Sequence, residues 1–145
     1  MIQMSAPVFE GTTPLVSDRY VTQEIAGEDL TIGQVVEITA DWTVKKPTTN
    51  PSLTRCGICQ ISALNGKAIS VLWRGLARVK AYGTITAGDA VGSGPGGTIQ
   101  TVPAPTATDC NTSAGTAAAI TKARNVMGWA NAGAASGGSA YILLI

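Results

Sequence analysis

The chain has 145 residues, of which 45% are hydrophobic and 13% charged, and its ten Lys and Arg against nine Asp and Glu leave a net charge of +1. This length favours one domain with a sizeable core, and so little charge excludes a disordered chain. Nucleic-acid binding needs clustered basic residues, whereas the longest basic run here is Lys45-Lys46. No apolar run approaches the roughly 20 residues of a membrane-spanning helix, and the start lacks the features of a signal peptide. We therefore expect a soluble protein, made and used without secretion, with neither a nucleic-acid nor a membrane partner.

Residues 1–19 are expected to form an N-terminal arm, separate from a single β-domain over residues 20–145. The stretch SAPVFEGTTPLVSD sets isolated apolar side chains among Pro7, Gly11 and Pro14, and prolines exclude it from a central strand. Terminal segments of this composition are often simply frayed, but the single phenylalanine of the chain lies here and favours an arm that docks on a neighbour. The predicted interface residues are Ala6, Pro7, Val8, Phe9, Pro14, Leu15 and Val16.

Beyond the arm, short stretches rich in Val, Ile and Thr alternate with Gly, Pro, Asn and Asp. This pattern is typical of an all-β domain, because β-branched side chains fit a pleated surface and the other residues favour turns. Strands are predicted at residues 20–25, 34–39, 42–45, 55–62, 68–73, 76–81, 90–92, 98–102, 126–132 and 140–144.

Two phrases of the sequence resemble each other. LTIGQVV begins at residue 30 and ITAGDAV at residue 85, which is 55 residues later. Downstream, Gly57 and Gly128, which are 71 residues apart, each open a small-residue strand that is followed by a glycine turn and a closing apolar strand. We predict two similar β-units in one fold. The extra length falls in residues 103–123, expected to be one long exposed loop with a helical turn near residues 116–123.

Residues 92–97 spell GxGxxG, the string of a dinucleotide-binding turn. Such a site needs the string to end a strand and to open a helix, whose N-terminus meets the pyrophosphate. Here TIQTV follows, which has the pattern of a strand. We interpret Gly92, Gly94 and Gly97 as turn glycines that reverse the chain between antiparallel strands.

Cys56 and Cys59 have CxxC spacing but few possible co-ligands. A structural zinc site needs four ligands, and the chain has no histidine and one further cysteine, Cys110. A redox pair of the thioredoxin type lies at a helix N-terminus, whereas these residues fall in a predicted strand. We interpret both as small buried hydrophobic residues and expect no metal.

The remaining residues suggest no catalytic set. The absence of histidine removes the commonest general base. The carboxylates are scattered singly except for Glu28-Asp29, which we interpret as solvated loop residues. Asn111-Thr112-Ser113 matches the glycosylation pattern without a secretion signal to support it. We therefore predict a protein that is not an enzyme and uses no cofactor.

The three tryptophans, Trp42, Trp73 and Trp129, are predicted to be core residues, because aromatic side chains dominate core energetics. The alternative is a platform on which a sugar stacks, and that would need two or more of them exposed together.

The segments GTITAGDAVGSGPGGTIQTV and VMGWANAGAASGGSAYILL together resemble the small decoration proteins, also called head-stabilising or cement proteins, of tailed bacteriophages. In that family a glycine-acid turn (here Gly88-Asp89) enters a strand, a Gly-rich reversal follows, and a G-x-A strand (here Gly128-Trp129-Ala130) precedes a glycine turn and an apolar last strand. The resemblance covers roughly residues 27–145.

This resemblance implies a compact β-sandwich or β-tulip domain that binds the major capsid protein on the outside of the head, as homotrimers at three-fold positions, with an N-terminal arm extending the contact. It places the protein in the virion, assembled in the host cytoplasm. Two alternatives stay open. One is a carbohydrate- or receptor-binding head-fibre module that uses Trp42 or Trp129, and the other is an enzyme that uses the Cys56/Cys59 pair or a carboxylate.

Overall fold

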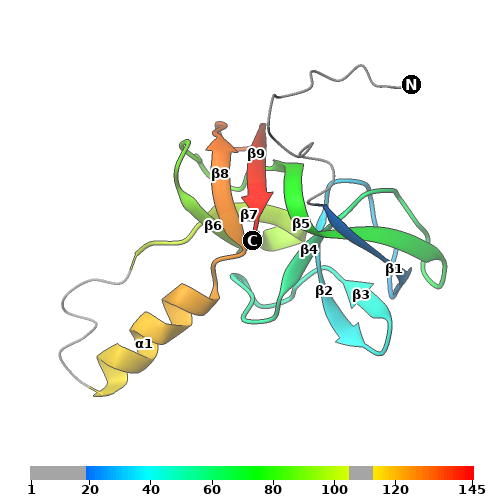
Figure 1. The fold of residues 1–145 in the computed structure, drawn as a ribbon, viewed down its shortest axis with the longest axis horizontal. Helices are drawn as coiled ribbons and strands as arrows, with labels where there is room; N and C mark the ends of the chain where they lie inside the picture. The colour runs from blue at the N-terminus through cyan, green and yellow to red at the C-terminus, as the bar shows by residue number, and fades with distance from the viewer. Residues whose placement is uncertain (1–18, 105–112) are drawn as a thin grey trace, which may run out of the picture.

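The computed structural model describes residues 19–104 and 113–145, and within them the fold is all-β, as predicted. Nine strands and one α-helix make up the regular structure of these residues (Figure 1). In chain order they are β1 (Tyr20–Ala26), β2 (Val35–Ala40), β3 (Thr43–Lys45), β4 (Cys56–Cys59), β5 (Ala68–Lys80), β6 (Ala90–Gly94), β7 (Thr98–Thr101), α1 (Ser113–Arg124), β8 (Gly128–Ala132) and β9 (Ser139–Leu144).

Strands β1 to β5 close into a first barrel. β1 pairs in parallel with β3, β3 pairs with β2, β2 with β4, β4 with β5, and β5 returns to β1, the last four pairings being antiparallel. Closure removes the free edges that an open sheet would present to other chains.

The long strand β5 belongs to two barrels at once. Its first half pairs with β1 and β4, and residues 75–80 pair with β9. The prediction of two strands, 68–73 and 76–81, was therefore wrong, because the chain continues through Arg74 and Gly75 without turning. Gly75 has φ +129°, a conformation that side-chain-bearing residues rarely adopt, and it lies where the strand exchanges one set of partners for the other.

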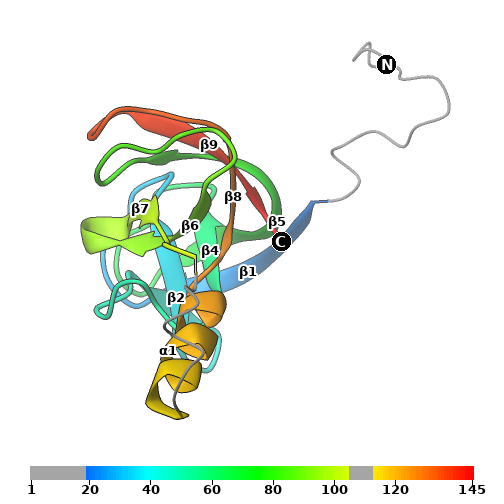
Figure 2. The same ribbon diagram turned by 90° about the vertical axis from the view of Figure 1, so that its left-hand side faces the viewer.

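The second barrel consists of the end of β5 with β9, β8, β6 and β7, in that order. A parallel bridge between Ala81 and Ile99 closes it, with the Tyr82 amide donating to the Ile99 carbonyl at 2.7 Å (Figure 2). The pairing directions match those of the first barrel, parallel bridge included.

The two barrels are copies of one pattern, which confirms the predicted two-unit fold. The bridge Leu30–Ala63 of the first barrel has its counterpart in Ile85–Ala134 of the second. These pairs are offset by 55 residues on their first member and by 71 on their second, the spacings of the sequence phrases. We call residues related by these two offsets equivalent.

Equivalent residues also fill the two barrel interiors. The first interior holds Ala26, Leu30, Val36, Val44, Cys59, Ile69, Val71 and Trp73, and the second holds, in the same order, Ala81, Ile85, Val91, Ile99, Ala130, Ala140, Ile142 and Leu144. Topology and inward positions are thus conserved between the barrels, whereas the residue types are not.

The outer face of the first barrel is also buried. Val35, Ile58 and Leu72 point away from the first interior, and they belong to the hydrophobic cluster that fills the second barrel. The first barrel therefore packs its side against the second, and one core extends through both.

The glycines that open β4 and β8 show why the repeat conserves them. A Cβ on Gly57 would lie 2.9 Å from the Leu72 carbonyl oxygen, and a Cβ on Gly128 would collide with the carbonyl oxygen of the equivalent residue, Leu143. Each glycine lets two strands approach closely at the same place in its barrel.

The predicted long loop 103–123 needs correction, because α1 occupies residues 113–124 and is far longer than one helical turn. Its run of alanines favours a helix, and Lys122 and Arg124 lie in the last turn, where cations complement the helix dipole. None of its residues is buried, and it projects away from both barrels (Figure 1 and Figure 2). The helix lies in the insertion that makes the second offset longer than the first.

Candidate functional site

The predicted interface residues of the arm, Ala6 to Phe9 and Pro14 to Val16, lie outside the described residues, as do Cys110 and Asn111. That interface therefore stays a prediction. The description that follows concerns residues 19–104 and 113–145.

The cysteine pair lies in the core, as predicted, and both thiols are free. Cys56 and Cys59 stand at the two ends of β4, roughly 10 Å apart along an extended strand and so too far for a disulfide. Burial raises the pKa of Cys56 to about 11 and that of Cys59 to about 12. Both thiols stay protonated at neutral pH, whereas a nucleophilic or redox cysteine needs the thiolate.

The glycine string forms a turn, as predicted. Gly92 and Gly94 belong to β6, a 3-10 turn spans Pro95–Gly97, and strand β7 follows directly. No helix N-terminus faces a phosphate at this place, which therefore has the structure of a hairpin.

Several carboxylates hold turns and loops. Glu28 accepts a hydrogen bond from the Lys46 amide at 2.8 Å, and Asp29 accepts one from the Asn65 amide at 2.9 Å. Within the described ranges, no group of three or more His, Cys, Asp or Glu side chains could hold a metal ion.

The tryptophan prediction was correct for one residue of three. Trp73 is buried in the first barrel, whereas Trp42 is 70% and Trp129 47% exposed. Trp42 lies at the hairpin tip between β2 and β3 and has φ +55°. Trp129 points outward from β8, because Gly128 and Ala130 on either side of it are buried.

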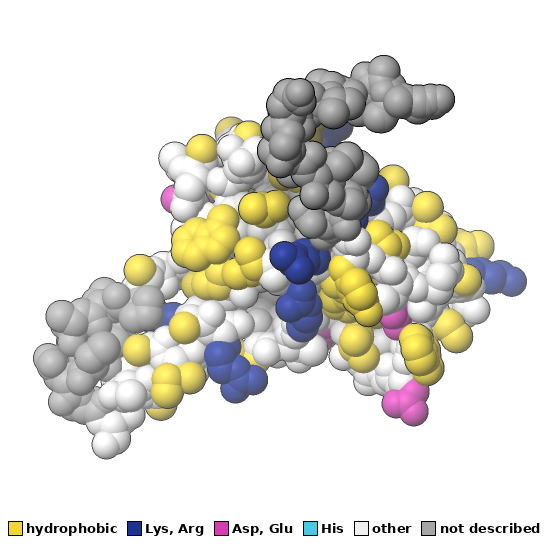
Figure 3. Space-filling model, viewed as in Figure 1, with side chains coloured by type: hydrophobic (Ala, Val, Ile, Leu, Met, Phe, Trp, Pro, Cys, Tyr) yellow, Lys and Arg dark blue, Asp and Glu magenta, His cyan; other side chains and the backbone are white. Residues whose placement is uncertain are grey.

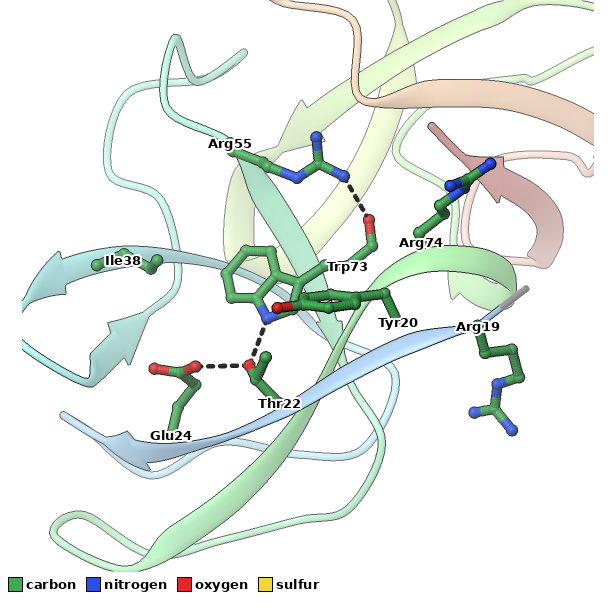
Figure 4. A pocket seen from close by; sticks show the side chains of 8 residues that line it. All are labelled: Arg19, Tyr20, Thr22, Glu24, Ile38, Arg55, Trp73 and Arg74. Carbon is green, nitrogen blue, oxygen red and sulfur yellow. Dashed lines mark hydrogen bonds between the residues drawn. The ribbon is translucent and has the colours of Figure 1, made fainter. Parts of the chain in front are cut away.

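One end of the first barrel opens into a pocket of about 560 Å³, which we call the first-barrel pocket (Figure 4). It is lined by Arg19, Tyr20, Thr22, Glu24, Ile38, Arg55, Trp73 and Arg74. The Trp73 indole nitrogen donates to the Thr22 hydroxyl at 2.6 Å, which in turn donates to the Glu24 carboxylate at 2.5 Å. Glu24 is only 7% exposed, and Arg55 donates to the Trp73 carbonyl at 2.9 Å. The pocket thus combines aromatic surface, a buried carboxylate and three arginines around its rim.

The second barrel presents an exposed apolar face. Leu143 on β9 pairs with Leu76 on one side and with Trp129 on the other, so the three side chains form one row across the sheet. They are 50%, 47% and 47% exposed for Leu76, Leu143 and Trp129, and Tyr141 lies in the next row. We call these four residues the Trp129 face. Neighbouring apolar side chains on an outward face mark an interaction surface when they are contiguous.

Basic side chains lie between the pocket and the Trp129 face. On β5, Arg74, Leu76 and Arg78 all point outward in alternation with buried residues. Figure 3 shows basic side chains in the middle of this side of the molecule, with hydrophobic groups on both sides of them. Within the described part of the chain, the one ion pair joins Lys46 to Glu28 at 4.0 Å. The arginines of this surface therefore have no carboxylate partner there.

Sequence reasoning missed both the pocket and the Trp129 face. One available signal was the run Tyr141-Ile-Leu-Leu-Ile145, which is apolar at both alternating positions. A strand with one face in water alternates apolar and polar residues, so a run that is apolar on both sides indicates that both can be covered.

No helix of the described residues is both long and apolar enough to cross a membrane.

Fold and surface together define an all-β protein built from two fused barrels, with a continuous apolar and basic surface on one side. No family model matches the sequence, and no curated protein matches it. Among solved structures, the chain is similar in fold to the N-terminal base of the head fiber protein gp8.5 of bacteriophage phi29, with a TM-score of 0.60 and 14% sequence identity. The similarity covers 88% of this chain and 94% of that one.

Proposed function

We propose that the chain is a structural protein of a bacteriophage head, which binds the outer surface of the capsid through the major capsid protein and stabilises the assembled shell. The observation that carries this proposal is the fold similarity to a head fiber base over most of both chains. The resemblance of the sequence motifs to phage decoration proteins supports the same location in the virion, on the exterior of the capsid.

The surface chemistry fits a protein partner. The Trp129 face supplies exposed aromatic and aliphatic side chains, and the arginines beside it lack carboxylate partners within the described residues. Tryptophan, tyrosine and arginine are the residues enriched at the energetic centres of protein interfaces. The described thiols and carboxylates, in contrast, are protonated in the core or engaged in turns and loops.

Stabilisation follows from linkage. A protein that binds the assembled lattice and not its dissociated subunits shifts the equilibrium toward the lattice, by about 2.7 kcal/mol per site at a free concentration of 100 times Kd. Many symmetric sites act on one shell, so a modest contribution from each copy suffices. The predicted arm and a homotrimeric state at three-fold positions belong to this proposal.

The test is co-sedimentation of the full chain with expanded heads that lack it, followed by a heat-release assay. We expect the chain to sediment with the heads and to raise the temperature at which they rupture. A Phe9→Ser, Leu15→Ser double variant should bind about tenfold more weakly, because two apolar anchors of the arm are lost. Thr13→Ser serves as the control in the same segment. A wild-type chain that stays in the supernatant would exclude the proposal.

The second candidate is a carbohydrate- or receptor-binding head-fibre module, which the exposure of Trp42 and Trp129 favours. It predicts binding to glycans that is lost in Trp42→Ala or Trp129→Ala. Glycan binding without co-sedimentation would favour this candidate over capsid binding.

A further inference from the structure

Each barrel of the chain has one outer face and one open end, and the two barrels use them differently. In the first barrel the outer face consists of Val21, Ile58 and Leu72, which pair across the sheet in one row. The equivalent row of the second barrel is Leu76, Trp129 and Leu143. The Trp129 face is therefore the second copy of a surface that the chain already contains once.

The first copy of that surface is covered. Ile58 and Leu72 are 1% and 0% exposed, although both point out of their own barrel. They share a cluster with Ala77, Val79 and Leu144, which are interior residues of the second barrel. Within the chain, an outer barrel face of this kind thus packs against the interior residues at the end of another barrel.

The equivalents of those three covering residues are Thr22, Glu24 and Trp73, which line the first-barrel pocket. In the second barrel this end is filled by the first barrel, whereas in the first barrel it is the open cavity of about 560 Å³. The chain therefore contains one face and one barrel end that are joined, and a second face and a second end that are both free.

We propose that the Trp129 face of one copy docks on the first-barrel pocket of a second copy, and so repeats between chains the contact that joins the barrels within each chain. Ile38 and Tyr20 at the rim, 49% and 61% exposed, supply apolar surface for this contact. The buried Glu24 carboxylate accepts a hydrogen bond from Thr22 and has room for further donors (Figure 4). The indole N–H of an incoming Trp129 is such a donor.

This contact is head-to-tail, because it joins two different surfaces. Such contacts close into rings when the rotation between neighbours permits and continue as filaments when it does not. A ring of three is the closure that the proposed function calls for. The docking itself does not depend on capsid binding.

The test measures the mass of the full chain by light scattering over a concentration series. We expect a multiple of the 14.7 kDa of one chain. Leu143→Glu, which alters the face, and Ile38→Glu, which alters the pocket, should each reduce the mass to that of one chain, because a carboxylate would be buried without a partner. Leu64→Glu, at a loop position that is 65% exposed, is the matched control and should keep the wild-type mass.

The decisive step is to mix the two variants. Leu143→Glu retains an intact pocket and Ile38→Glu an intact face, so an equimolar mixture should form a complex of two chains and grow no further. Circular dichroism checks that each variant is folded, and Trp129→Gln replaces Leu143→Glu if the latter is not. A wild-type monomer, an unchanged mass for Leu143→Glu or Ile38→Glu, or a mixture that stays monomeric would each overturn the proposal. A monomer that sediments with heads would overturn it and leave capsid binding standing.

Discussion

The two barrels share strand order, pairing directions and register, yet they are filled by different residues. At equivalent interior positions the first barrel has Glu24 and Trp73 where the second has Val79 and Leu144. The polar residue lies at the open end and the apolar ones at the covered end. The comparison indicates that turns and strand pairing set the topology, while the residues at each barrel end follow from what covers that end.

The hairpin tips differ in a second way. Gly97 of the second barrel has φ +79°, a conformation that suits glycine, and the equivalent residue in the first barrel is Trp42 at φ +55°. A bulky residue in this region costs roughly 1–2 kcal/mol. Trp42 recovers little of that by burial, because it is 70% exposed.

The largest predicted effect tests whether the barrels unfold as one unit. Ile142 lies in the second interior, in the same cluster as Ile58 and Leu72 of the first barrel. Ile142→Ala should lower the free energy of unfolding by about 2–5 kcal/mol, because it leaves a cavity. Denaturant unfolding, followed by circular dichroism and by tryptophan fluorescence, should show one coincident transition. Ile61→Ala, at a position that is 48% exposed, should change little, and two separate transitions would show that the barrels are independent.

A smaller effect distinguishes the hairpin tips. Trp42→Gly removes the backbone strain at the cost of glycine's greater freedom in the unfolded chain, so stability should stay equal or rise by up to about 1 kcal/mol. The reciprocal Gly97→Ala should lose about 1–2 kcal/mol, since its Cβ would also lie 2.9 Å from Cβ of Gln34. Thermal unfolding of both variants measures the difference, and a loss of stability in Trp42→Gly would contradict this reading of the tip.

The smallest effect concerns Cys59, whose equivalent is Ala130. The thiol of the unfolded chain loses its proton near pH 9, whereas burial raises the pKa of the folded one to about 12. The unfolded state therefore binds fewer protons above pH 9, so stability is fully present at lower pH and falls as the pH rises. Between pH 7 and pH 10 the wild type should lose more than Cys59→Ala, by up to about 1 kcal/mol. Equal losses in denaturant titrations at the two pH values would show that Cys59 does not contribute.

Strand positions and the doubling of the fold could be predicted because they depend on local patterns. Thr31 and Thr86 each receive a hydrogen bond at the backbone amide from the side chain three residues later, Gln34 or Asp89. Such turns are encoded within a few residues, so the repeated phrases were sufficient to detect them. The continuation of β5 through Gly75 was not predictable in this way, because a glycine between two apolar runs is equally typical of a turn.

The candidate surfaces depended on contacts between distant residues. Nothing local distinguishes Trp73, which is buried, from Trp129, which is half-exposed. The same holds for the pocket, whose lining comes from β1, β2 and β5 as well as from the loop before β4.

Leu72 and Leu143 show where the limit lies. They are the same residue type at equivalent positions, both pointing out of their barrels, yet one is 0% and the other 47% exposed. The amino-acid sequence determined the strands, their inward and outward sides and the repetition of the pattern, because backbone alternation and turn geometry are local properties. Only the tertiary structure decided which outward side is covered, because that depends on whether another barrel packs against it.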